Sequence, residues 1–143
     1  MKIVGLELKR LMNLIVRYFH NFADDYDLSM NHAAIIKYLV KNKDENVYTK
    51  DIEKIFNVRS STTSRMLTLM EFNGLIERID DKNDTRRKII KPTKKAIEVV
   101  NSINNKLEKV EIKLKENIKK DELDIFFKVV EQMKQNIKVE DEG

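Results

Sequence analysis

The sequence contains no cysteine, one proline and three glycines in 143 residues. Without cysteine the chain cannot form disulfides, thiolate zinc sites, catalytic thiols or thiol-based redox sensors. Its glycines, at positions 5, 74 and 143, are too far apart to build a Gly-rich phosphate-binding loop. Charged residues make up 36% of the chain, and this composition is typical of a helix-rich soluble protein rather than an all-β or disordered one.

Long hydrophobic runs are also missing. Glu7, Lys9 and Arg10 interrupt the apolar residues near the amino terminus, so no signal-peptide core forms. No segment approaches the roughly 18 apolar residues that span a bilayer. No combination of nucleophile, base and orienting residue is recognisable either. We therefore expect a cytoplasmic protein that is not an enzyme and needs no cofactor.

One group of polar residues invites comparison with a metal site. His20 and His32, with Asp24, Asp25 and Asp27 between them, supply the imidazoles and carboxylates that many metal ions prefer. Their spacing matches no defensible metal-binding pattern, so we expect no metal here.

Apolar residues spaced three and four apart predict long helices at both ends of the chain. The first runs from Leu8 to about residue 25, the second from Ala96 through Ile118, and the last from about Asp121 through Ile137. A helix of about 25 residues is nearly 40 Å long, too long to bury its apolar stripe within a small domain. We therefore expect residues 1–28 and 96–143 to form a helical dimerisation region.

The middle of the chain predicts three shorter helices. Ser29 is placed to cap the first of them, and Thr49 to cap the second. Asn57 tolerates a left-handed backbone and so predicts a turn after the second helix. The third helix is expected from about Ser60 and should stop at Gly74.

The third of these helices opens with five hydroxyl residues, Ser60 to Ser64. Such residues bond to nearby backbone and weaken helices, so taken alone they favour a solvated turn. At the start of the second helix of a helix-turn-helix they have another use, because short hydroxyls let the helix approach DNA closely and bond to phosphates. Helical spacing places Thr63 on the buried face and Ser61, Thr62 and Arg65 on the opposite one.

Two β-prone runs follow Gly74, namely Leu75–Ile79 and Arg87–Lys91, joined by a polar loop. The segment Glu77–Lys95 holds eight Lys or Arg residues against four Asp or Glu, a net charge of +4 that equals that of the whole chain. A basic hairpin alone is as consistent with a solvated charged loop as with a binding element. Following a helix-turn-helix, it favours contact with DNA, since a loop arginine fits the minor groove.

The run MEFNGLIERIDDKNDTRRKIIKPTKKA resembles the MarR family of winged-helix transcriptional regulators, and IEKIFNVRSSTTSRM resembles the family's helix-turn-helix. The resemblance implies that Arg86 is the minor-groove residue at the tip of the wing and that Asp84 holds it in place. It also implies a homodimeric regulator, typically a repressor, often controlled by a small aromatic or phenolic effector. Arg59 stands where the family often has a capping serine. It is either the last residue of the turn or the first of the helix, with Ser60 as a replacement cap.

The sequence therefore predicts a mainly α protein with a small β-hairpin wing, in which residues 29–95 form a winged helix-turn-helix lobe. As a dimer it should bind pseudo-palindromic double-stranded DNA, with the recognition helix in the major groove and the wing in the minor groove. The expected DNA-binding residues are Arg59, Ser60, Ser61, Thr62, Ser64, Arg65, Arg86, Arg87 and Lys88. The alternative is a helical dimeric protein-interaction module whose basic hairpin binds an acidic partner.

Overall fold

The computed structural model describes residues 2–22 and 28–142, with side chains described as far as residue 138. Its elements are α1 (Val4–His20), α2 (Met30–Lys41), β1 (Val47–Tyr48), α3 (Thr49–Phe56), α4 (Ser60–Phe72), β2 (Ile76–Asp80), β3 (Lys88–Pro92), α5 (Lys94–Lys115) and α6 (Lys120–Glu142). They form two compact units, residues 1–110 and 111–143. The predicted fold class, mainly helical with a small β wing, is confirmed.

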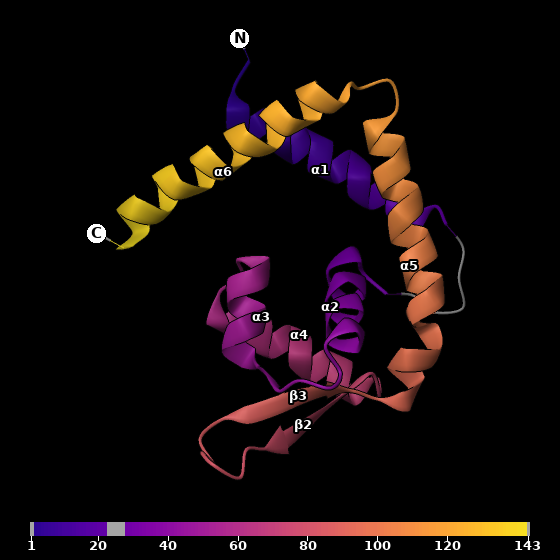
Figure 1. Ribbon diagram of the computed structural model, residues 1–143, viewed down its shortest axis with the longest axis vertical. Coiled ribbons are helices and arrows are strands. Elements are labelled where there is room, and N and C mark those ends of the chain that lie inside the picture. Colours follow the sequence, from indigo (N-terminus) through magenta and orange to yellow (C-terminus); the bar gives the residue numbers. More distant parts are fainter. Residues whose placement is uncertain (1, 23–27, 143) are drawn as a thin grey trace. The chain divides into compact units, whose positions relative to one another are not determined.

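The winged lobe has one apolar core to which every major element contributes. Ile35 of α2, Ile52 of α3, Leu67 of α4, Ile76 of β2 and Ile90 of β3 are all essentially inaccessible to solvent. Figure 1 shows α2, α3 and α4 gathered on one side of the strands, with the loop between β2 and β3 projecting beyond the helices. Burial of these aliphatic side chains is the main force that fixes the two helices of the helix-turn-helix against the sheet.

The ends of the short helices follow local signals in the sequence. Ser29 caps α2, since its hydroxyl accepts a hydrogen bond from the His32 backbone N–H at 3.2 Å. Asn57 adopts the predicted left-handed conformation with φ 52°. The prediction that Thr49 caps α3 is wrong. The cap residue is Tyr48, whose backbone N–H donates to the Asp51 carboxylate at 2.9 Å, so that an acid three residues on replaces a hydroxyl cap.

The sheet has three antiparallel strands in the order β1-β3-β2, one more than the predicted hairpin. Val47 of β1 lies opposite Ile90, and Arg78 of β2 lies opposite the same residue on its other side. A two-residue strand carries no periodic signal of its own, so only its pairing with β3 reveals β1.

The long helices differ from the prediction at their ends. Helix α1 begins at Val4 rather than Leu8, and it ends at His20, so the predicted continuation to about residue 25 is wrong. The predicted breakers Asp24, Asp25 and Asp27 lie outside the described residues. Helix α5 stops at Lys115, so Ile118 falls in the connection to α6, where Asn117 has φ 62°. None of the helices in the described residues is long and apolar enough to cross a membrane.

Gly74 offers a stability test with an internal control. It has φ +75°, where a residue with a side chain is strained, although a Cβ at this position would have open space around it. We expect Gly74→Ala to lower the free energy of unfolding by about 1–2 kcal/mol. Gly5 lies in helix α1, and space is open there too. Because Ala favours a helix over Gly, Gly5→Ala should leave the free energy of unfolding unchanged or raise it by about 0.5–1 kcal/mol. Urea unfolding at one fixed protein concentration measures both, and equal effects would contradict the backbone argument.

Candidate DNA-binding surface

The start of α4 is settled by its backbone. Arg59 occupies the cap position with extended angles, φ −66° and ψ 153°, and the helix proper begins at Ser60. Arg59 is therefore the last residue of the turn. The alternative in which Ser60 serves as the cap is wrong, because Ser60 already lies inside the helix. The Arg59 side chain itself makes no capping hydrogen bond.

The hydroxyl run divides between core and surface as its helical spacing predicts. Thr63 is fully buried among the apolar residues of the lobe. The other members, together with the two flanking arginines, are exposed: Arg59, Ser60, Ser61, Thr62, Ser64 and Arg65. No hydrogen bond or ion pair occupies the guanidinium groups of Arg59 and Arg65 within residues 2–22 and 28–138. This turn of helix thus presents small hydroxyls between two unpaired cations.

The wing loop is built around a buried acid that the sequence did not single out. The Asp81 side chain is only 4% exposed. It accepts hydrogen bonds from the Asn83 backbone N–H (3.0 Å), the Tyr48 hydroxyl (3.1 Å) and Arg87 Nη2 (2.9 Å). The Arg87 guanidinium also stacks 4.1 Å from the centre of the Tyr48 ring. These contacts tie the loop to β1.

Asp84 lies at the turn of the same loop and binds Arg86. Its carboxylate accepts from the Arg86 backbone N–H and from Arg86 Nε, both at 3.1 Å. The Arg86 side chain is nevertheless 88% exposed, so its guanidinium extends from the tip of the wing with one edge held.

The other wing cations are more engaged than the sequence implied. Arg87 is held by Asp81 and Tyr48 as described, and Lys88 pairs with Asp80 across the hairpin. Arg87 therefore has a structural task in addition to any contact with a ligand. Surface ion pairs such as Lys88–Asp80 exchange readily for other partners, because each is worth about 1 kcal/mol or less.

Hydrogen bonds lower the pKa values of the wing carboxyls. The Asn83 backbone N–H, followed by the Tyr48 hydroxyl and Arg87, lowers the pKa of Asp81 despite its burial. The Arg86 side chain and then its backbone N–H lower the pKa of Asp84. Both acids are therefore charged at neutral pH and keep the loop arginines in place.

A second unpredicted contact joins the wing to α4. Arg78 Nη2 on β2 donates to the Thr68 hydroxyl at 3.2 Å and to the Glu71 carboxylate at 3.0 Å, both on α4. The hydrogen bond from Arg78 also lowers the pKa of Glu71. The Asp-x-Asn spacing at Asp81 is typical of an Asx turn and could have been noticed in the sequence. The contact of Asp81 with Tyr48 and the contact of Arg78 with α4 could be found only in the folded structure.

The surface thus combines a helix start rich in hydroxyls and arginines with a projecting basic loop, held in one lobe. The sequence pattern that defines the MarR family matches residues 29–88 of the chain. The transcription regulator MarR from Oenococcus oeni PSU-1, known from its crystal structure, is 31% identical in sequence; the two align over 93% of this chain and 99% of that one, with a TM-score of 0.79. The chain belongs to the MarR family.

Two further comparisons concern the sequence and the fold. The transcriptional regulator BilQ from Clostridioides difficile (strain CD3) is 34% identical over 64 residues, which cover 45% of this chain and 43% of that protein. The chain therefore matches less than half the length of that curated relative. The S. aureus MepR–DNA complex aligns over 95% of this chain and 99% of its own with a TM-score of 0.86, and at 20% identity it shows the fold alone.

Members of the MarR family are transcriptional regulators and not enzymes, so this chain is a MarR-family transcriptional regulator. The prediction that it is not an enzyme is confirmed by its family.

The buried acid of this MarR-family wing can be tested directly. Asp81→Asn keeps an acceptor for the Asn83 N–H but removes the charge that holds Arg87. We expect trypsin to cleave the loop of the variant several-fold faster, because the loop opens locally more often. Asp80→Asn, at an exposed ion pair of the same hairpin, is the matched control, and equal cleavage of the two variants would contradict the role of Asp81.

The same contacts predict how wing order depends on pH. Because the pKa of Asp81 is lowered in the folded state, its contribution is fully present above the ordinary Asp pKa of about 3.9 and is lost as pH falls through the lowered value. The protection of the loop amides, that is, their exchange corrected for the intrinsic pH dependence of amide exchange, should therefore fall at acidic pH in the native protein. In Asp81→Asn the dependence should be clearly weaker, with the remainder due to Asp84, whose pKa is also lowered; an unchanged dependence would assign it to other acids.

Proposed function

We propose that this MarR-family regulator binds pseudo-palindromic double-stranded DNA as a homodimer, with α4 in the major groove and the wing in the minor groove. The observation that carries the proposal is that Arg78 hydrogen-bonds to α4, so the exposed hydroxyl and arginine residues of the helix and the Arg86 tip belong to one braced lobe. Fixed spacing between two reading elements is what simultaneous contact with adjacent grooves requires. The MepR complex with DNA supports the same use of this fold.

The residues proposed to contact DNA divide by chemistry. On α4, Ser61, Thr62, Ser64 and Arg65 are placed for base edges and phosphates, with Arg59 and Ser60 near the backbone at the helix start. On the wing, Arg86 is proposed for the minor groove, while Arg87 and Lys88 contribute positive charge beside it. The lobe of residues 29–95 is proposed as the DNA-binding part.

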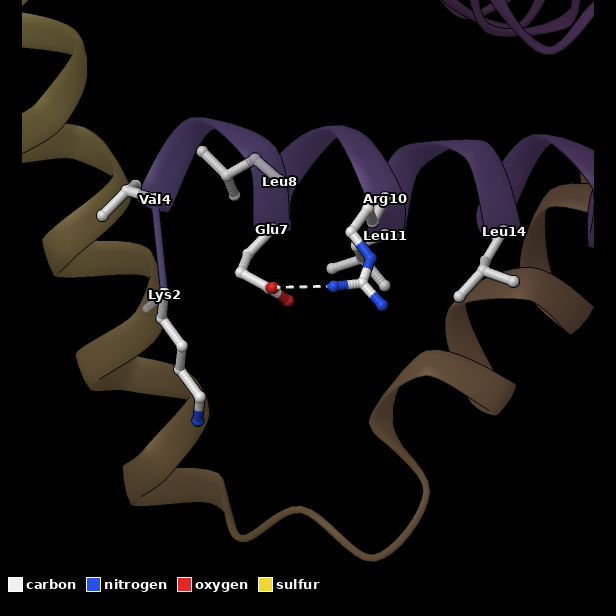
Figure 2. Close-up of a pocket in the computed structure, with 7 residues that line it drawn as sticks. All are labelled: Lys2, Val4, Glu7, Leu8, Arg10, Leu11 and Leu14. Atoms are coloured by element: carbon white, nitrogen blue, oxygen red, sulfur yellow. Dashed lines mark hydrogen bonds and ion pairs between the residues drawn. The ribbon is translucent and has the colours of Figure 1, made fainter.

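Apolar side chains left exposed support dimerisation. One face of α1 carries Val4, Leu8, Leu11 and Leu14, which line an open groove of about 540 Å³; Figure 2 shows these side chains beside the Glu7–Arg10 ion pair. Helix α6, taken by itself, likewise exposes Phe126, Phe127 and Ile137. Monomeric proteins rarely leave such large apolar areas open, so we assign residues 1–28 and 96–143 to a dimerisation region, with these apolar faces at its interface.

Regulation by a small aromatic or phenolic effector and a cytoplasmic location remain part of the proposal. Any effector that binds better to one separation of the two DNA-binding lobes than to another shifts the population of binding-competent dimers. The alternative function, a dimeric module whose basic hairpin binds an acidic partner, makes a different prediction. Such a module would not distinguish duplex DNA from an unrelated polyanion such as heparin.

The wing assignment is tested with Arg86→Ala. Loss of a minor-groove arginine should weaken binding to a mixed-sequence duplex roughly tenfold and make its salt dependence shallower. Lys37→Ala, at an exposed position of α2, removes the same charge and serves as the control. Fluorescence anisotropy at several salt concentrations, with heparin as competitor, measures both variants. An Arg86→Ala protein with native affinity and salt slope would refute the wing assignment.

The dimer interface is tested on α1 with two matched substitutions. Leu11→Asp places a charge in the apolar groove, whereas Leu6→Asp introduces the same charge about 140° around the helix. Leu6 and Leu11 are 55% and 41% exposed in the single chain, so neither substitution disturbs the core of the lobe. Sedimentation velocity should show a dimer for the native protein and Leu6→Asp, and dissociation for Leu11→Asp. An unchanged dimer in Leu11→Asp would place the interface elsewhere.

A further inference from the structure

A second hollow lies in the winged lobe, between the wing and the start of α3. It has a volume of about 680 Å³ and is lined on the wing side by Arg86, Arg87 and Lys88 and on the α3 side by Thr49 and Lys50. The two carboxylates at its edge are already engaged. Asp51 accepts the Tyr48 backbone N–H, and Asp84 accepts from Arg86. We call this hollow the wing groove.

Among the four cations of the wing groove, Lys50 differs from the others. Arg86, Arg87 and Lys88 each have a carboxylate partner in the lobe, namely Asp84, Asp81 and Asp80. Lys50 is exposed and makes no hydrogen bond or ion pair with any side chain that the structure describes, and the Thr49 hydroxyl is equally free. An unneutralised amine beside a free hydroxyl, among further cations, favours an anion with several acceptor oxygens.

We propose that the wing groove holds a backbone phosphate of the bound duplex, with Lys50 as its principal partner and the Thr49 hydroxyl as a hydrogen-bond donor. This inference rests on the proposed function, since it places the phosphate on a strand that borders the minor groove entered by Arg86. Arg86 lines the same groove, so a strand beside its guanidinium lies within reach of Lys50. The contact would fix the depth and register of the wing without reading sequence.

The test compares Lys50→Gln with Lys54→Gln. Both residues are exposed lysines of α3, one helical turn apart, but only Lys50 lines the groove. Loss of one phosphate contact should reduce the slope of log affinity against log salt by about 0.9. Lys50→Gln should show this reduction on duplex DNA and Lys54→Gln should not. Equal slopes for the two variants would overturn the proposal.

A second measurement locates the phosphate. A set of duplexes is prepared, each with one neutral methylphosphonate at a different backbone position. At one position the replacement should weaken binding of the native protein but cause no further loss of affinity in Lys50→Gln, which already lacks that contact. If the two losses add at every position, the proposal is wrong. A native protein that does not prefer duplex DNA to heparin would contradict the proposed function itself. Additive losses in a protein that does prefer duplex DNA would contradict only the Lys50–phosphate contact.

The source of the phosphate is tested without DNA. Inorganic phosphate at millimolar concentration should leave the NMR signal of the Lys50 side chain unchanged, because an open groove binds a free anion poorly. A saturable shift that Lys50→Gln abolishes would assign the wing groove to a free anion and overturn the proposal.

Discussion

The pairing of β3 with both β1 and β2 is the constraint on which the DNA-binding lobe depends. Ile90, at the centre of β3, is fully buried and lies opposite Val47 on one side and Arg78 on the other. Strand β1 leads directly into α3, and β2 follows α4 after Gly74, so both helices of the helix-turn-helix are attached to the same central strand. A displacement of the wing relative to α3 would break the β1–β3 pairing and expose Ile90.

Two polar contacts extend that constraint to the surface. Arg78 connects β2 to the exposed side of α4, and Asp81 connects the wing loop to Tyr48 on β1. Each uses a hydrogen bond to a charged carboxylate, and such bonds are stronger than those between neutral groups. The result is a division of labour within a basic hairpin: Arg78 and Arg87 hold the lobe together, whereas Arg86 is left to extend from it.

Features with local causes could be predicted from the sequence. The cap at Ser29, the left-handed turn at Asn57 and the stop at Gly74 each depend on a few neighbouring residues, and all three are present. The burial of Thr63 among exposed hydroxyls followed from helical spacing alone.

Features that depend on distant residues could not be predicted. Strand β1 exists because Val47 lies opposite Ile90, 43 positions along the chain. Likewise, Asp81 is distinguished from Asp80 and Asp84 by its burial and by its contacts with Tyr48 and Arg87. The resemblance to the MarR family supplied Arg86 and Asp84 as site residues, but it gave no indication of Lys50, because its role depends on the shape of the wing groove.

We propose above that two copies of this lobe bind one duplex through a two-fold symmetric arrangement. Selection from a pool of random duplexes, with the native protein at physiological salt, tests that claim most directly. We expect enrichment of a pseudo-palindrome whose half-sites lie about one helical turn, or about 10 base pairs, apart. A pool that shows no enrichment, or one that yields a single unsymmetrical site bound by one chain, would contradict it.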